Sequence, residues 1–408
     1  MKLNMENFGP YGTVSLDFDY RNGNPKRLIA IYGQNGSGKT QLCKALEFLP
    51  EVTMTCNVQG LACKHSTYRE VSRGAKRKGA EGDMSLTYTF DVKGRSITYK
   101  VIFDDDGELL SEQLHDDYGS ADGFDYFRYD KAVNSEKPDE MGVLPRYCNT
   151  SSVNRILMEN INDHTFLSTL LLYPGLKNLI REDLREILND LDRMILPKRY
   201  YGGPIGDWCY GQINAGDVEV LKARADVIAH ILKESDKTIT GVRYEISETP
   251  EGTVCSGTVS YYLVVSRMVE GVEVDNHIEY EGDGIRHLVS ILPKIIPSTS
   301  WRMAVVDDFD TDLGEALTTE LIDQLSSQIN GQLVVSLKTA EPLRNLDPRC
   351  VYIIDMDENG HRSVMTVSDR ITTGKTNNNA ARFRDGKLGG SPNIGRIDFD
   401  LVFNRLRE

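Results

Sequence analysis

The sequence predicts a mixed α/β fold, and three observations support this prediction. An apolar, strand-like run at residues 28–32 leads through a glycine-rich turn into an amphipathic helix pattern with apolar positions from 42 to 49. A second apolar run, residues 303–306, ends in two aspartates, and residues 84–103 alternate polar and apolar side chains as strands do. Strands and helices of these kinds along one chain indicate an α/β protein.

The turn at residues 33–40 has the sequence GQNGSGKT, which is the P-loop pattern in its strand–turn–helix setting. Its glycines allow successive N–H groups to point into one anion-sized hollow at a helix N-terminus, where the helix dipole favours phosphate. Lys39 is expected to reach the β- and γ-phosphates of ATP, and the Thr40 hydroxyl is expected to ligate Mg²⁺. The residues predicted to bind the nucleotide are Gly33, Asn35, Gly36, Ser37, Gly38, Lys39, Thr40 and Gln41.

Composition limits the alternatives. The 408 residues include 47 basic and 61 acidic side chains, and the formal net charge of −14 argues against a surface coated with nucleic-acid-binding basic residues. No apolar run approaches the roughly 20 residues of a membrane span, and the first residues lack the layout of a signal peptide. The seven cysteines are scattered, which predicts reduced thiols in a cytoplasmic protein. Cys56, Cys63 and His65 lack a fourth ligand, so ordinary packing is favoured over a zinc site.

Residues 1–150 are predicted to form the first half of a nucleotide-binding lobe. Residues 2–8 and 14–20 flank a Gly-Pro-Tyr-Gly turn and predict a β-hairpin. Alternating strands at 84–92 and 96–103 predict a β-meander beside it.

Two segments of this half lack a clear period. Residues 56–82 are rich in lysine and arginine, which predicts a mobile surface loop or, as the alternative, a contact surface for nucleic acid or an acidic protein. Residues 119–150 mix Asp, Gly, Tyr and Pro and are expected to cross the surface without regular structure.

Helical spacing resumes at residue 153, and residues 151–237 are predicted to form a short helical lobe inserted between the two halves. Strands return at 239–247 and 253–270 and open the second half, residues 238–408. The late Gly-Lys-Thr at 374–376 lacks the strand and the upstream glycine of a P-loop, so a flexible loop is favoured there.

The apolar run 303–306 ends in Asp307 and Asp308, which is the pattern of a Walker B segment. A carboxylate at a strand end can hold Mg²⁺ and a second one can orient the attacking water, so Asp307 is assigned to the metal and Asp308 to the water. A second candidate phosphate cradle opens an apolar helix about twenty residues earlier, at Gly282, Asp283 and Gly284. An NTPase with a single self-contained site would not need this second cradle.

The order of P-loop, β-meander, helical insertion, glycine-rich helix start and Walker B strand resembles the ABC-type, AAA-family ATPases of the RecF, SMC and OLD group. The chain also resembles the compact ATPases of phage-defence and abortive-infection operons, such as the AriA subunit of PARIS systems. Residues 331–343, 351–364 and 383–395 are similar to that family's last strands and glycine-rich tail. The resemblance implies an ABC-type ATPase head that carries a β-meander and a short inserted helical lobe and uses ATP and Mg²⁺.

In that family the signature segment of one subunit closes over the nucleotide in the P-loop of another, which implies a head-to-tail homo-oligomer with sandwiched ATP. By position the signature is residues 281–285, with Gly282 where a serine is usual and Gly284 at the family's glycine. Asp308 stands where the family's catalytic base is Glu, and Lys338 where a switch His is usual. The shorter carboxylate and the missing imidazole predict slow hydrolysis with binding retained. Lys338 can still contact the γ-phosphate as a cation, with an exposed structural lysine as the alternative.

The resemblance implies a sensor or scaffold in antiphage defence. Such an ATPase would hold a separate toxic effector, a toprim- or HNH-type nuclease encoded nearby, and release it in response to a phage-encoded trigger. No nuclease motif is found in this sequence, so a partner is expected to do the cutting. The alternative is a RecF-like DNA-repair ATPase that acts as an ATP-gated DNA clamp. The acidic balance favours the first hypothesis, whereas the basic residues between 64 and 78 keep the second open.

Overall fold

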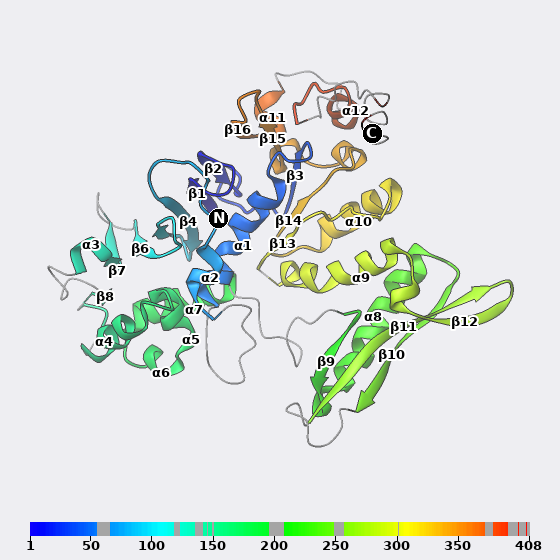
Figure 1. Cartoon of the computed structure of the whole chain (residues 1–408), viewed down its shortest axis with the longest axis horizontal. Helices are drawn as coiled ribbons and strands as arrows, with labels where there is room; N and C mark the ends of the chain where they lie inside the picture. Colours follow the sequence, from blue (N-terminus) through cyan, green and yellow to red (C-terminus); the bar gives the residue numbers. More distant parts are fainter. Residues whose placement is uncertain are drawn as a thin grey trace.

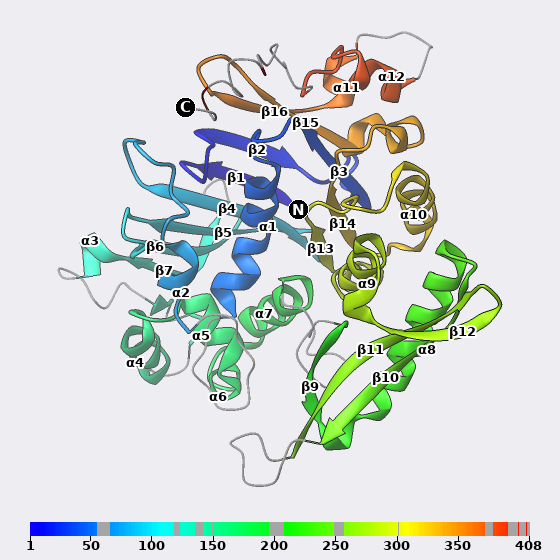
Figure 2. The same cartoon turned by 45° about the vertical axis from the view of Figure 1, so that its right-hand side comes forward.

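The protein is a mixed α/β molecule built on three β-sheets (Figures 1 and 2). A computed structural model describes residues 1–54, 66–117, 123–134, 142–144, 146–148, 151–195, 208–248, 257–300, 302–371 and 378–390, together with Phe399 and Arg405. The predicted α/β class is confirmed, because a sheet of parallel strands covered by helices stands beside two antiparallel sheets.

The sheet that contains the P-loop strand has the order β13-β14-β3-β15-β16, and its first four strands run parallel. The strands are β3 Leu28–Gly33, β13 Met303–Val306, β14 Gln332–Ser336, β15 Val351–Met356 and β16 Arg362–Thr366. Ile29 and Ile31 of β3 join the core around helix α1, Lys39–Thr53. Ala30 and Tyr32 join the core on the opposite face. Because both faces of β3 are buried, its sequence is a continuous apolar run without polar alternation.

The second sheet is antiparallel and has the order β2-β1-β4-β5-β6-β7-β8. Its strands are β1 Lys2–Glu6, β2 Thr13–Asp17, β4 Met84–Val92, β5 Arg95–Phe103, β6 Leu109–Asp116, β7 Phe124–Asp130 and β8 Gly142–Val143. The predicted hairpin is confirmed by the pairing of Lys2 with Asp17, and the predicted meander by the pairing of Met84 with Phe103.

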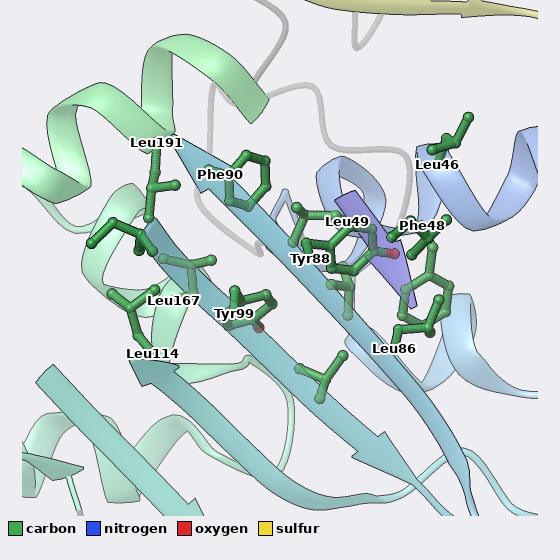
Figure 3. Packing of buried hydrophobic residues seen from close by; sticks show 14 of the residues in the cluster. Leu46, Phe48, Leu49, Leu86, Tyr88, Phe90, Tyr99, Leu114, Leu167 and Leu191 are labelled. Carbon is green, nitrogen blue, oxygen red and sulfur yellow. The ribbon is translucent and has the colours of Figure 1, made fainter. Parts of the chain in front are cut away.

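Helix α1 is packed against both of these sheets, because its apolar side chains point in more than one direction. Figure 3 shows the side chains where it meets the second sheet: Leu46, Phe48 and Leu49 from α1, and Leu86, Tyr88 and Phe90 from β4. The Tyr88 hydroxyl donates a hydrogen bond of 2.7 Å to the backbone oxygen of Ala45. Burying each large apolar side chain contributes about 1.5–3 kcal/mol, so the helix behind the P-loop is firmly anchored.

Strand β7 corrects one prediction. The segment 119–150 was expected to lack regular structure, but its described residues include β7 and the short helix α3, Lys131–Asn134. Tyr126 and Phe127 are both fully buried although they are neighbours. The β6–β7 register shifts at His115, which leaves an extra residue on β7, and this bulge breaks the alternation that would have marked a strand.

Four helices pack beyond the meander, and they are α4 Ser151–Asn160, α5 Phe166–Leu172, α6 Pro174–Lys177 and α7 Glu182–Ile195. Figure 3 shows Leu167 and Leu191 from these helices, which belong to the same core cluster as Leu114 of β6. The buried Glu112 carboxylate accepts hydrogen bonds from the backbone N–H groups of Phe166 at 2.6 Å and Leu167 at 2.8 Å. Complete burial raises the pKa of Glu112 to about 7, although these hydrogen bonds lower it in part. A polar contact therefore fixes the start of α5 inside an apolar core.

The third sheet contains β9 Tyr210–Asn214, β10 Ile239–Glu248, β11 Thr258–Val269 and β12 Val272–His277. Helix α8, Glu219–Ser235, packs against β10 and contributes Ile228 and Leu232 to the same core as Leu263. The described residues of the predicted lobe 151–237 thus contact two different sheets. Residues 151–195 lie with the meander, whereas α8 lies with β10 and β11.

The remaining helices complete the chain. They are α2 Tyr68–Ser72, α9 Asp283–Ile295, α10 Glu315–Gln328, α11 Val367–Arg370 and α12 Asn379–Arg384, with the 3-10 helices η2 Ala215–Asp217, η3 Ile278–Tyr280, η4 Ile296–Thr299, η5 Glu341–Arg344 and η6 Pro348–Cys350. Helices α9, α10 and α12 contribute to the core on the Tyr32 face of the parallel sheet. None of the helices that the structure describes has the length and apolar content of a membrane span. The predictions for Cys56, Cys63 and His65 and for residues 374–376 fall outside the described residues.

Candidate functional site

The P-loop turn connects β3 to α1, and its shape depends on two glycines. Gly36 has a φ of 77° and Gly38 a φ of 112°, a left-handed region that disfavours residues with a Cβ. A Cβ built on Gly38 would also lie 2.7 Å from the Tyr11 hydroxyl oxygen, which itself bonds to the Gly38 carbonyl. Gly38 precedes α1 without giving it a side-chain cap. Because the first N–H groups of a helix lack intrahelical partners, this turn offers donors to an anion.

Lys39 is buried inside the turn. Its ammonium group donates hydrogen bonds to the backbone oxygens of Gly33 at 2.6 Å and Gln34 at 3.3 Å. Burial lowers the pKa of Lys39, and the nearby Asp308 carboxylate opposes that shift. The side chain is therefore a cation without a carboxylate in direct contact among the described residues, which is a suitable arrangement for binding a phosphate.

A cavity of about 700 Å³ lies over this turn, and its lining is strongly basic. It includes Asn35, Gly36, Gly38, Thr40 and Gln41 from the predicted nucleotide-binding set. The charged side chains around it are one carboxylate, Asp308, and six basic residues: Lys39, Lys76, Arg77, Lys78, Lys338 and Arg362. In a chain whose net charge is −14, this concentration of positive charge favours a polyanionic ligand.

The basic residues 76–78 reach the cavity because their backbone is tied to the first hairpin. The N–H of Arg77 bonds to the Asn7 oxygen at 2.7 Å, and the N–H of Gly9 bonds to the Ala75 oxygen at 2.7 Å. The surface-loop prediction is wrong for Tyr68–Ser72, which form α2, whereas residues 73–82 are turns and bends that are largely exposed, as predicted. Residues 55–65 fall outside the described part of the chain. A local excess of lysine and arginine was the available signal, but it did not reveal that residues 76–78 line the P-loop cavity or that the Lys76 ammonium group pairs with Asp105.

Arg362 is a site residue that the sequence analysis missed. It lies on β16, and its guanidinium donates to the backbone oxygens of Ser37 at 2.8 Å and Gly36 at 3.2 Å. Arg362 thereby connects the outer strand of the sheet to the middle of the P-loop. No local motif marks it, because an arginine on an edge strand is common and its partner lies more than three hundred residues away.

The structure brings Asp308 of the predicted Walker B pair to the same cavity, whereas Asp307 lies beside it and does not line the cavity. Asp307 and Asp308 directly follow β13, and Ser336 at the end of β14 donates to Asp307 Oδ1 at 2.5 Å. The N–H of Asp308 in turn bonds to the Ser336 hydroxyl at 2.7 Å. Lys338 Nζ lies 3.1 Å from Asp308 Oδ1, and both side chains are about half exposed. Asp308 and Lys338 therefore line the cavity opposite Lys39 as an ion pair.

The backbone around Lys338 is also fixed. Asp310 Oδ2 accepts hydrogen bonds from the N–H groups of Lys338 at 2.7 Å and Thr339 at 2.6 Å. No role in the site was assigned to Asp310 or Ser336 from the sequence pattern. Both act on the site by holding the segments that carry its charged residues.

The oxygen ligands predicted for Mg²⁺ fit that ion in kind. Thr40 lines the cavity with an exposed hydroxyl, and Asp307 lies next to Asp308 at the carboxyl end of β13. A hydroxyl and one or two carboxylates, completed by water and substrate phosphates, form the usual environment of Mg²⁺ in nucleotide sites. These residues are therefore compatible with the metal.

The predicted signature residues lie elsewhere. Gly282 precedes α9, and Asp283 and Gly284 form its first turn, where Asp283 pairs with Arg286. Gly282 and Asp283 are exposed, and none of these residues lines the P-loop cavity of the described chain. The second cradle is thus available to a neighbouring molecule and is not joined to the first.

One family model matches the first part of the chain. Residues 2–50, which include β1, β2, β3 and most of α1, match the family model described as "AAA domain". No curated protein matches the sequence significantly.

The chain is similar to solved structures of SMC head domains, at low sequence identity. One is an SMC head bound to the C-winged helix domain of ScpA, with 13% identity, 90% of this chain and 96% of that chain covered, and a TM-score of 0.46. Another is the SMC head domain from Thermotoga maritima, with 13% identity, coverages of 90% and 97%, and a TM-score of 0.38. A third is an SMC head with an extended coiled coil bound to the C-terminal domain of ScpA, from Pyrococcus furiosus, with 14% identity, coverages of 90% and 96%, and a TM-score of 0.44.

Proposed function

We propose that this protein binds ATP with Mg²⁺ in the P-loop cavity and hydrolyses it slowly. The observation that supports this most directly is the convergence of the P-loop, six basic side chains and the Asp308 carboxylate on one cavity. A triphosphate carries the complementary charge, and the match of residues 2–50 to an AAA domain agrees with a nucleotide ligand.

Each residue of the site has a different proposed role, which follows from its position. Lys39 exchanges its backbone partners Gly33 and Gln34 for phosphate oxygens, and the free N–H groups at the start of α1 bind the same phosphates. Thr40 and Asp307 hold Mg²⁺, which neutralises charge on the phosphate oxygens. Asp308 orients the attacking water.

Hydrolysis is expected to be slow for two reasons. Asp308 is one methylene shorter than the glutamate usual at this position, and its carboxylate is engaged by Lys338 at 3.1 Å. A carboxylate held by an ammonium group is less free to approach a water molecule. Binding of the γ-phosphate by Lys338 would free Asp308, so we propose that substrate binding itself prepares the base.

We further propose that two copies close head to tail around ATP. The start of α9 supports this proposal, since Gly282 and Asp283 are exposed and separate from the cavity of their own chain. A helix N-terminus placed against the partner's γ-phosphate would complete the site. Asp283 opposes an anion at this position, and its pairing with Arg286 reduces that opposition.

The biological role that we propose is a sensor or scaffold that controls a separate nuclease in antiphage defence, as in the compact defence ATPases that the sequence resembles. The main support for the alternative DNA clamp was the basic stretch between residues 64 and 78. Of its described basic members, Lys76, Arg77 and Lys78 line the nucleotide cavity, so these three have a function that needs no DNA. Arg69 pairs with Glu108 at 3.1 Å, and Arg73 does not line the cavity.

The test is the mass of the purified protein with and without Mg²⁺–ATP, for the wild type, Asp308→Ala and Lys39→Ala. We expect ATP to double the mass of the wild type transiently and of Asp308→Ala persistently, and to leave Lys39→Ala unchanged. A monomer mass in every case would contradict the sandwich. Salt-dependent binding of duplex DNA at near-physiological salt would favour the clamp over the sensor.

A further inference from the structure

The turn that carries Asp308 has a backbone that its own sequence does not favour. Asp308 has a φ of 50° and Asp312 a φ of 58°, so two residues with a Cβ occupy the left-handed region within five positions. Aspartate adopts this region more readily than most residues with a Cβ but less readily than glycine, so contacts with the surroundings help to hold it there. The contacts around the turn therefore decide where the Asp308 carboxylate points.

One side of the turn is held by the end of β14. The N–H of Phe309 bonds to the Ser336 backbone oxygen at 3.1 Å, and the N–H of Asp308 bonds to the Ser336 hydroxyl at 2.7 Å. Asp310 adds its two hydrogen bonds to the backbone of Lys338 and Thr339. These contacts join the turn to the strand beside the P-loop strand.

The other side is held by the first turns of α9. His287 Nε2 lies 3.1 Å from the backbone oxygen of Phe309, and it must be the donor because a carbonyl oxygen can only accept. Gly284 packs against the far end of the turn, where a built Cβ would lie 2.5 Å from the Asp312 oxygen. The beginning of α9 is thus in contact with both ends of the turn.

The same first turn of α9 has an outward side. Gly282, Asp283 and Arg286 are exposed, while Gly284 and His287 are half-buried against the Asp308 turn. A molecule bound to the exposed side would contact the helix whose inner side contacts Asp312 through Gly284 and Phe309, the residue next to Asp308, through His287.

We infer that His287 is a positioning residue for Asp308, and that the first turn of α9 couples contact with a second copy to the orientation of that carboxylate. This inference rests on the proposed ATP sandwich. When the partner's nucleotide seats on α9, His287 holds the Phe309 carbonyl and keeps the turn in its left-handed form, with Asp308 directed into its own cavity. Two sites that bias one element in this way affect each other's activity.

A hydrogen bond of this kind affects the rate more than the binding. ATP is expected to contact the P-loop, which His287 does not touch, whereas a misplacement of the water by about 1 Å from its base can cost about 100-fold in rate. Loss of His287 is therefore expected to separate turnover from affinity.

The test compares His287→Ala and His287→Gln with the wild type, using Lys294→Ala, an exposed position on the same helix, as the control. A glutamine amide can donate to the Phe309 oxygen. We measure ATP affinity, turnover at saturating ATP as a function of protein concentration, and the unfolding midpoint. We expect the turnover of His287→Ala to fall about tenfold and no longer to rise with protein concentration, while its ATP affinity stays within about twofold of the wild-type value. We expect His287→Gln to recover most of the turnover.

The inference is overturned if the turnover of His287→Ala equals that of the wild type, or if its affinity falls in parallel with turnover. It is also overturned if His287→Gln is as impaired as His287→Ala, because the hydrogen bond would then not be the cause. If the proposed ATPase function itself is wrong, the result is different. The wild type and Lys294→Ala would then show no ATP-dependent mass change and no turnover, and the proposed coupling through His287 would be wrong as well.

Discussion

The P-loop and the Asp308 turn follow parallel strands of one sheet and open onto one cavity, yet they obtain their shapes in opposite ways. Both need left-handed backbone. The P-loop supplies it with glycines, Gly36 at a φ of 77° and Gly38 at 112°. The other turn uses Asp308 at 50° and Asp312 at 58°, a residue type that adopts this region less readily than glycine and is held here by contacts with β14 and α9.

This difference shows where the information for each half of the site resides. The P-loop is specified by consecutive residues and can be recognised in the sequence. The Asp308 turn is specified by β14 and α9, through Ser336 and His287. Binding is therefore expected to depend mainly on local sequence, and hydrolysis on the packing of distant segments.

The largest effect is expected from Lys39→Ala. Leaving phosphate charge without the buried ammonium is expected to cost about 3–5 kcal/mol, or about 1,000-fold in ATP affinity. Titration calorimetry with Mg²⁺–ATP measures this. Lys44→Ala, an exposed lysine on the same helix, is the control and should bind as the wild type does. Equal losses in both variants would show that the effect is not local to the P-loop.

Asp308→Asn should separate the two turns. Asparagine tolerates the left-handed backbone, so the turn is preserved while the base is removed. We expect turnover to fall about 100-fold, at the lower end of what a general base contributes, with ATP affinity within about threefold. Steady-state phosphate release and calorimetry give the two numbers. A parallel loss of affinity would assign Asp308 to binding.

Gly38→Ala and Asp312→Gly test the source of the left-handed backbone. Alanine at Gly38 meets a φ penalty of about 1–2 kcal/mol and the Tyr11 hydroxyl at 2.7 Å, so urea unfolding should show a clear loss of stability. Glycine at the exposed Asp312 should leave stability within about 1 kcal/mol, because relief of strain offsets the added freedom of the unfolded chain. A large loss in Asp312→Gly would mean that its side chain has a role of its own.

The smallest effect on ATP affinity is expected from Arg362→Ala. This variant tests whether the P-loop depends on a contact from outside its own sequence. Removal of its hydrogen bonds to the Ser37 and Gly36 oxygens should lower ATP affinity about fivefold, corresponding to about 1 kcal/mol. Arg362→Lys keeps the charge but cannot reach both oxygens equally well, so its ATP affinity should lie between those of the wild type and Arg362→Ala. An unchanged affinity in Arg362→Ala would make the P-loop independent of β16.

The sequence predicted those parts of the fold that leave a local period. The hairpin from Lys2 to Asp17 and the first strands of the meander alternate plainly, and the buried strand β3 precedes the P-loop as expected. Strand β7 escaped prediction because a bulge buries the adjacent Tyr126 and Phe127. The periodicity of apolar residues indicates which side chains are buried, but it does not indicate which other segments pack against them.

The site shows the same limit. Lys39, Thr40, Asp308 and Lys338 were assigned from motifs and family resemblance, and the structure brings these four to one cavity. The residues that complete the cavity or shape it, such as Arg362, act across long sequence separations and carry no motif. Their contribution is geometric, so it becomes visible only when the chain is folded.

The most direct test of the central claim is an experimental structure of the protein with Mg²⁺ and a non-hydrolysable ATP analogue. The account predicts a β-phosphate inside the turn at residues 33–40 and a γ-phosphate within hydrogen-bonding distance of Lys39 and Lys338. It would be contradicted by an analogue found elsewhere, for example in the polar cavity of about 1510 Å³ beside Lys26 and Arg349, with the P-loop cavity left without a nucleotide.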